Sequence, residues 1–164
     1  MKKESFVSMM DDVERATVKL ASLVPEDKLD VSPIPGSMTL RCLLFHLGLV
    51  GDTAQCQLSG QWKMEKPDWN LPKSMTKEKL IERIRAGYAG LRQCYAELPQ
   101  GQFETRVTQT PWGAEGTIEE LSFSVIYNHE IHHKMQLFMD LKALGIEVDT
   151  GTLYMGLDPG VVKT

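Results

Sequence analysis

Residues 117–145 have the sequence TIEELSFSVIYNHEIHHKMQLFMDLKALG, which predicts the best-defined helix of the chain. Thr117 and Glu120 have the spacing of a capping box, in which each side chain bonds the backbone of the other residue at a helix start. Apolar residues then recur at helical spacing from Ile118 to Leu144. Gly145 ends the pattern, because glycine adopts the left-handed conformation of a helix terminus at low cost. The stretch therefore predicts one long helix over residues 117–144.

Three further amphipathic patterns precede this helix. Apolar residues repeat at helical spacing over residues 6–23, 37–58 and 76–98. Ser5 can cap the first pattern, either Ser37 or Thr39 can cap the second, and the third begins at Thr76. Four amphipathic helices of similar length are typical of an all-α four-helix bundle, which is the predicted fold class.

The segments that link these helices are long and contain several prolines and glycines. An extended chain covers about 3.4 Å per residue and a helix about 1.5 Å, so each link can run the full length of a bundle. A crossover topology is therefore permitted, although the sequence does not require it. Residues 105–108 are predicted to form at most a short extended piece, and the tail from Ile146 onward is predicted to be irregular.

Length and composition are those of an ordinary globular protein, and one domain is predicted over residues 1–164. The net charge of −4 argues against a nucleic-acid partner, because phosphate binding needs clustered positive charge. The longest apolar run, Leu43–Val50, is too short to cross a membrane, and the N-terminus does not have the pattern of a signal peptide. Three cysteines do not suggest a disulfide framework, so reduced thiols in the cytoplasm are expected.

Three of the four histidines lie in the last predicted helix. His129 and His133 are four positions apart, so they share a helix face and could bind one metal ion. His46 borders the apolar face of the second predicted helix and is the candidate third ligand. Neutral imidazole suits Zn, Ni, Cu, Fe or Co ions, and three nitrogen ligands leave a position open for water or substrate. The sequence therefore predicts an open metal centre of the catalytic kind.

Simpler roles for the same residues compete with this prediction. His46 taken alone is more often a core histidine with satisfied hydrogen bonds. The pair His129 and His133 favours a metal, because burying two imidazoles one turn apart without a shared partner costs several kcal/mol. Cys42 lies one turn before His46 and is either a fourth ligand or, more in keeping with its type, a buried structural cysteine.

The run His129-Glu130-Ile131-His132-His133 also matches the motif of zinc peptidases, in which Glu130 would be the general base. The extended form of that motif requires glycine and histidine where this chain has Gln136 and Met139. No other histidine follows, and a third ligand is therefore missing. The pattern disfavours a peptidase.

Residues 37–47, 116–121, 129–137 and 141–148 resemble, in that order, segments of the DinB/YfiT-like family of small metal-binding four-helix bundles. The resemblance implies that His46, His129 and His133 are the metal ligands and that Gln136 is a polar neighbour. It also implies an up-down-down-up bundle and a homodimer. Met135 departs from the family, which often has a small residue there.

Characterised members of this family include thiol transferases and isomerases that use bacillithiol, mycothiol or glutathione, with zinc or nickel as the usual metal. The resemblance therefore implies a divalent metal cofactor, with a low-molecular-weight thiol as a candidate cosubstrate. The first hypothesis is a metal-dependent thiol transferase or hydrolase that acts on a small electrophilic substrate. Glu130 or Gln136 would orient water or a metal ligand. The alternative is a metal- or stress-responsive binding protein without turnover, and the sequence leaves open whether the protein is an enzyme.

Overall fold

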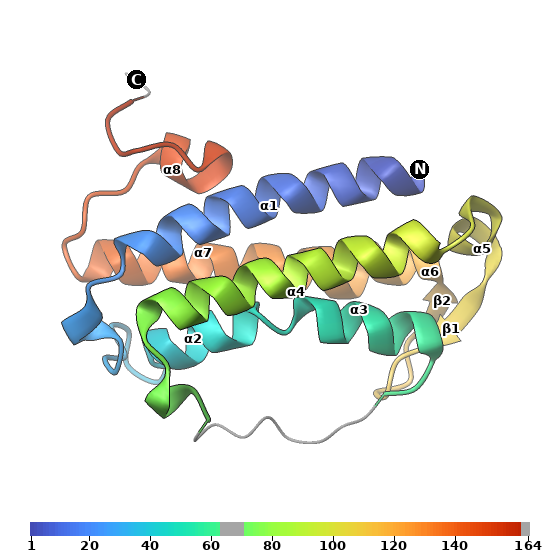
Figure 1. Cartoon of the computed structure of the whole chain (residues 1–164), viewed down its shortest axis with the longest axis horizontal. Coiled ribbons are helices and arrows are strands. Elements are labelled where there is room, and N and C mark those ends of the chain that lie inside the picture. The colour runs from blue at the N-terminus through green and yellow to red at the C-terminus, as the bar shows by residue number, and fades with distance from the viewer. Residues whose placement is uncertain (63–70, 162–164) are drawn as a thin grey trace.

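The computed structural model describes residues 1–62 and 71–161, and four long helical segments make up most of this part of the chain (Figure 1). The all-α class predicted from the sequence is confirmed. The first two segments are α1 (Lys3–Leu23) and the pair α2 (Leu40–Leu47) and α3 (Val50–Ser59). The last two are α4 (Lys77–Glu97) and the run α6 (Ile118–Leu121), η3 (Ser122–Tyr127) and α7 (Asn128–Ala143).

The four segments lie side by side but do not simply alternate in direction. In Figure 1, α1 and α7 run from right to left, whereas α2, α3 and α4 run from left to right. α4 contacts α1, α2 and α3, and α7 contacts α1 and α2. The second and third segments therefore run in the same direction, as the long link between them permits.

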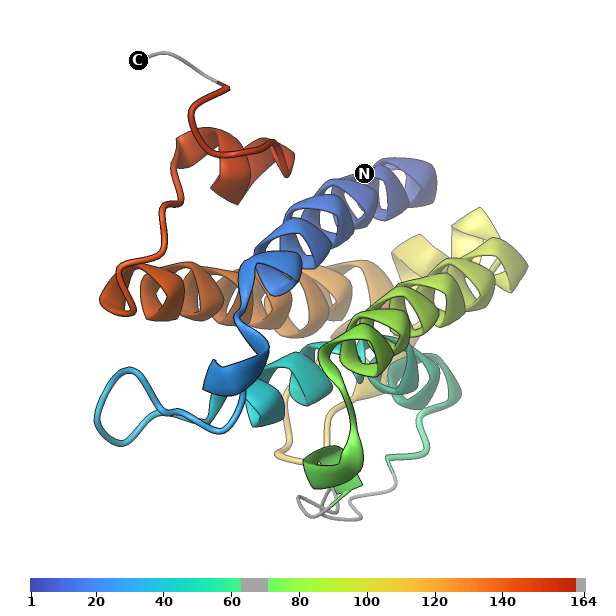
Figure 2. The same cartoon turned by 60° about the vertical axis from the view of Figure 1, so that its left-hand side comes forward.

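The remaining elements are short. They are η1 (Glu26–Lys28), η2 (Leu71–Ser74), α5 (Gln100–Thr105), β1 (Val107–Gln109), β2 (Glu115–Thr117) and α8 (Thr150–Met155). β1 and β2 pair antiparallel, with Thr108 opposite Gly116, so the predicted extended piece is one strand of a small hairpin. The prediction of an irregular tail was wrong over α8, which packs against α1 (Figure 2). Asp149 caps this helix, because its side chain accepts a hydrogen bond from the backbone N–H of Thr152.

Three predicted helix starts are confirmed: Thr76, Thr117 and, of the two candidate caps Ser37 and Thr39, the second. The side chains of Thr39, Thr76 and Thr117 each accept a hydrogen bond from a backbone N–H in the first turn that follows, and Thr117 and Glu120 form the expected capping box. Ser5 is not a cap, because α1 already begins at Lys3 and has no side-chain cap.

The predicted helix over residues 37–58 is interrupted after Leu47, and α3 resumes at Val50. The cause lies in the close approach of α4. A Cβ atom on Gly48 would stand 2.6 Å from the Cγ atom of Arg83, and one on Gly51 would stand 2.5 Å from the carbonyl oxygen of Gly87. Glycine permits this contact between backbones, and the break after Leu47 turns α3 along α4. The prediction of one continuous helix was wrong at this point.

The fourth segment contains a π-helical stretch, η3, in place of the continuous α-helix predicted. Buried polar groups surround this wider turn. The Gln57 side chain donates to the Ile118 carbonyl oxygen and to the Ser122 hydroxyl, each at 3.2 Å, and Ser122 also bonds the Tyr95 hydroxyl. These bonds satisfy polar atoms near the irregular turn that would otherwise be buried without partners. The stretch ends just before His129 and thereby sets the face on which the histidines lie.

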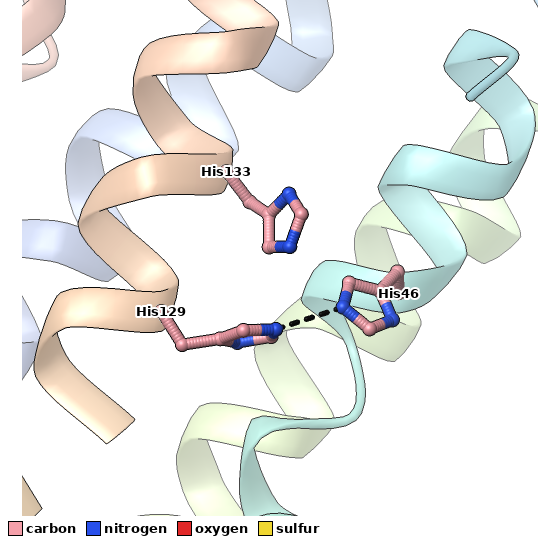
Figure 3. Close-up of side chains that lie close together, drawn as sticks. All are labelled: His46, His129 and His133. Carbon is pink, nitrogen blue, oxygen red and sulfur yellow. Dashed lines mark hydrogen bonds between the residues drawn. The ribbon is translucent and has the colours of Figure 1, made fainter. Parts of the chain in front are cut away.

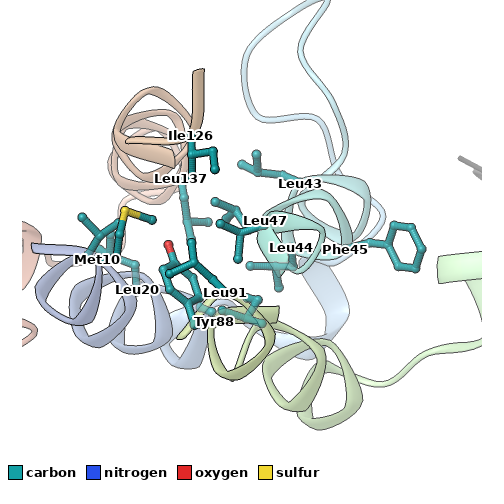
Figure 4. Close-up of a cluster of buried hydrophobic side chains, with 14 of the residues drawn as sticks. Met10, Leu20, Leu43, Leu44, Phe45, Leu47, Tyr88, Leu91, Ile126 and Leu137 are labelled. Atoms are coloured by element: carbon teal, nitrogen blue, oxygen red, sulfur yellow. The ribbon is translucent and has the colours of Figure 1, made fainter. Parts of the chain in front are cut away.

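The apolar core fills the space between the four segments (Figure 4). Met10 and Leu20 of α1, Leu47 of α2, Tyr88 of α4 and Leu137 of α7 are fully buried there. Burial of this kind drives the packing of the amphipathic faces. None of the helices in the described part of the chain is both long and apolar enough to cross a lipid bilayer.

One buried carboxylate stands out among these apolar contacts. Asp140 of α7 is fully buried, and neither of its side-chain oxygens has a hydrogen-bond partner among the described residues. Burial raises the pKa of this carboxyl to about 6. Because the folded-state pKa lies above the ordinary value, the protonated form favours folding, and stability is lost as the pH rises from about 4 to about 6.

Replacing Asp140 with asparagine should therefore stabilise the protein at pH 8 by about 2 kcal/mol, and the gain should shrink toward zero near pH 4. Urea unfolding at the two pH values measures this difference. Asp27→Asn, at an exposed position, is the control and should change little at either pH. An equal gain at both pH values would show that the charge of Asp140 is not the cause.

Candidate metal centre

Three histidine side chains from two helices converge at one point (Figure 3). His46 is on the last turn of α2, and His129 and His133 are on consecutive turns of α7. One ligand nitrogen of each residue lies within 4.8 Å of the others. The Nε2 atoms of His46 and His129 are 2.9 Å apart. The structure thus brings together the three residues that were predicted as metal ligands.

The second nitrogen of each α7 imidazole faces a side chain of the same helix. Nδ1 of His133 lies 3.0 Å from Oε1 of Gln136, which is an acceptor, so Nδ1 carries the proton and Nε2 is free to bind a cation. Nδ1 of His129 lies 3.4 Å from Oε1 of Glu130. A carboxylate or amide behind a ligating imidazole fixes its tautomer and its orientation.

Glu130 is held in the core behind His129. It is only 1% exposed, and its Oε2 accepts a hydrogen bond of 2.9 Å from the hydroxyl group of Tyr88 on α4. Burial raises the pKa of the Glu130 carboxyl, while the contacts with His129 and Tyr88 oppose that shift. Glu130 therefore lies on the Nδ1 side of His129, and its position suits a partner of the imidazole rather than an open-site base.

The electrostatic surroundings of His46 and His133 favour the neutral form of these two imidazoles. Burial, followed by the proximity of His129 and His133, lowers the pKa of His46 to about 4. Burial also lowers the pKa of His133, partly opposed by its bond with Gln136. A neutral imidazole is the form that ligates a metal, so at neutral pH no proton has to leave His46 or His133 first.

The donor set fits a divalent cation of the transition series. Zinc–nitrogen bonds are about 2.0–2.1 Å long, and small ring rotations would bring nitrogens that lie within 4.8 Å of one another to this distance from a common centre. Three imidazoles leave at least one coordination position for water or a substrate. Cys42, considered as a fourth ligand, does not belong to this cluster among the described residues, and His132 is exposed.

Sequence reasoning missed the role of Tyr88. Tyr88 lies within the amphipathic pattern predicted over residues 76–98, and its side chain is fully buried. Nothing in the pattern indicated that its hydroxyl group would meet Glu130, which is 42 positions away in the chain. A tyrosine on a buried stripe needs a polar partner, and that requirement was the only available signal.

We compared the sequence with models of known protein families, and the match covers the part of the chain that contains the histidine cluster. The family model of the DinB superfamily matches residues 9–137, a range that includes the three histidines and Gln136. The chain belongs to the DinB superfamily.

The solved structure of a DinB-like protein has a similar fold. The crystal structure of YjoA, a DinB-like protein from Bacillus subtilis, matches with a TM-score of 0.68 and 21% sequence identity, over 88% of this chain and 94% of that one. At this identity the likeness shows the DinB fold alone. No curated protein matches the sequence significantly.

Proposed function

We propose that this DinB protein binds one divalent metal ion through His46, His129 and His133. The observation that carries the proposal is the convergence of three imidazole nitrogens within 4.8 Å, although His46 and His129 are 83 positions apart in the chain. The Nε2 atoms of His46 and His129 face each other at 2.9 Å, and a cation between such nitrogens would be shared by both imidazoles. Membership in a superfamily whose members generally bind metals supports the same function.

The finer proposal is a metal-dependent enzyme of the thiol-transferase or hydrolase type, acting on a small electrophilic substrate, with zinc or nickel as the ion. A bound divalent ion lowers the pKa of a thiol or a water molecule and so supplies a nucleophile at neutral pH. Gln136 holds the proton of His133 on Nδ1, and Glu130 orients His129 from the core. Both residues would act through the ligands, and neither would contact the substrate.

A peptidase of the His-Glu-x-x-His type is disfavoured by the position of Glu130. A general base must reach the water that it activates. The Glu130 carboxylate is instead 1% exposed, bonded to Tyr88 and placed behind the His129 ring.

We also propose that the four segments form an up-down-down-up bundle and that the protein works in a reducing compartment such as the cytoplasm. The directions of the segments in Figure 1 support the topology. Three free cysteines in the described part of the chain are compatible with a reducing compartment.

The test is a transferase assay on protein loaded with zinc or nickel. Bacillithiol, mycothiol and glutathione are each combined with an epoxide or an alkyl halide, and loss of free thiol is followed. We expect turnover with at least one thiol, and we expect His46→Ala to abolish it without unfolding the protein. The same assay without thiol tests hydrolysis.

Three outcomes would contradict the proposal. Tight metal binding without turnover of any pair would support a binding protein instead. Peptide cleavage that is lost in Glu130→Gln but retained in His46→Ala would restore the peptidase. Absence of metal binding in the wild-type protein would remove the proposal altogether.

A further inference from the structure

A cavity lies where α1, α7 and α8 meet. It is separate from the histidine cluster, in which His129 and His133 of α7 point toward His46 of α2 (Figure 3). The volume of the cavity is about 230 Å³. Most of its lining is apolar and comes from α1, from the end of η3, from α7 and from α8. The residues that line it are Met9, Asp12, Val13, Tyr127, Ile131, Lys134, Met135, Leu153 and Tyr154.

Lys134 is the unusual member of this lining. It is only 5% exposed, and it makes no hydrogen bond or ion pair with any residue that the structure describes. Its ammonium group lies 5.6 Å from the centre of the Tyr154 ring, which also lines the cavity. The face of an aromatic ring attracts a cation but cannot replace a counterion.

The acidic residue of the lining, Asp12, makes no hydrogen bond or ion pair with Lys134, although its negative charge partly opposes the lowering of the Lys134 pKa by burial. One carboxylate oxygen of Asp12 accepts a hydrogen bond of 2.7 Å from the guanidinium of Arg15, on the exposed surface of α1. The Lys134 ammonium borders the cavity and is not among the fully buried polar atoms, so it is only partly desolvated. A partly desolvated charge without a hydrogen-bonded partner gains from an anion beside it. The cavity therefore has a charged group that an anion would stabilise, surrounded by surfaces that an apolar group would cover.

We propose that this cavity binds a small organic monoanion, a carboxylate with a short apolar body, whose negative group pairs with Lys134. One ammonium group matches one negative charge, and the neighbouring Asp12 disfavours a dianion such as phosphate. The apolar body would contact Val13, Ile131 and Leu153. The cavity is smaller than the range of about 300–1,000 Å³ that is usual for drug-sized ligands, so the ligand has about ten heavy atoms or fewer.

Benzoate is a suitable probe, and benzamide is its uncharged counterpart. Calorimetric titration of the metal-loaded protein should give a Kd of about 0.1–1 mM for benzoate, and benzamide should bind at least about tenfold more weakly. Lys134→Met keeps the length of the side chain, removes its charge and should weaken benzoate binding by about tenfold or more. Lys142→Met is the matched control, because Lys142 is an exposed lysine of the same helix that also lies over an aromatic ring.

The experiment must separate this cavity from the metal centre, since carboxylates also ligate metals. Benzoate binding should therefore persist in metal-free His129→Ala protein, and its loss there would overturn the proposal. Equal binding of benzamide, unchanged binding in Lys134→Met, or tighter binding of inorganic phosphate than of benzoate would overturn it as well. If Lys134→Met does not fold, Leu153→Trp fills the cavity from α8 and should abolish benzoate binding. Because these readouts do not depend on turnover, failure of the enzymatic proposal leaves them intact.

Discussion

Replacement of His129 with alanine is expected to lower the affinity for zinc by about 10²–10³-fold. Structural zinc sites with four ligands bind with about 10–16 kcal/mol, so each ligand accounts for about 2.5–4 kcal/mol. The loss should be at the upper end, because alanine also removes the group that Glu130 orients. Competition against a chromophoric chelator at pH 7.5 measures the affinity of both proteins.

His132→Ala is the matched control for this substitution. His132 lies between the two predicted ligands in sequence, but its side chain is exposed and does not belong to the cluster. Its replacement should leave the zinc affinity within about twofold of the wild-type value. If both variants lose zinc equally, or if His129→Ala retains full affinity, the assignment of the three histidines as ligands is wrong.

Gly87→Ala is expected to destabilise the fold by about 2–3 kcal/mol, although alanine normally favours a helix over glycine by about 1 kcal/mol. A Cβ atom on Gly87 would lie 2.6 Å from the carbonyl oxygen and 3.1 Å from the carbonyl carbon of Gly48. Both are backbone atoms, so α2 and α3 must move away from α4 to make room. Urea unfolding measures the loss of stability.

Gly90→Ala is the control on the same helix. A Cβ atom there would meet the Cα atom of Gly51 at 3.7 Å, an ordinary contact, so the substitution should stabilise the protein by about 0.5–1 kcal/mol. The two glycines are one turn apart, and their opposite effects would isolate backbone contact from helix propensity. If Gly87→Ala proved neutral or stabilising, the close contact between α2, α3 and α4 would be disproved.

The same contact links the fold to the metal centre. Gly48 is two residues beyond His46, so a shift of Gly48 moves the end of α2 that carries the predicted ligand. Zinc affinity should therefore fall in Gly87→Ala and remain unchanged in Gly90→Ala. The chelator titration described for His129 measures this effect as well.

Local patterns of the sequence were sufficient for the elements that depend on neighbours along the chain. Thr39, Thr76 and Thr117 were predicted to begin helices, and each does, because a cap requires only the backbone of the following turn. The spacing of His129 and His133 likewise placed two imidazoles on one face, since the period of a helix is a local property. The same reasoning predicted the apolar stripe that carries Tyr88.

Features that depend on groups distant in the chain were not accessible in this way. The interruption after Leu47 arises from the approach of Gly87, and η3 is surrounded by bonds from Gln57 and Tyr95. The order of residues along one helix contains no information about which backbone will pack against it. The helix α8 was also missed, because a stretch this short is stable mainly through its packing on α1.

Residue types and their local periodicity thus established that the chain is helical, where three of its four long helical segments begin, and which histidines are candidates for metal binding. Only the packing of the helices brings His46 to His129 and buries Glu130 against Tyr88. The same packing places Lys134 in a cavity without a hydrogen-bonded partner among the described residues. The physical reason is that hydrogen bonding within a helix and capping act between neighbours in sequence. Desolvation, close contact and the pairing of charges depend on groups that become neighbours only when the chain has folded.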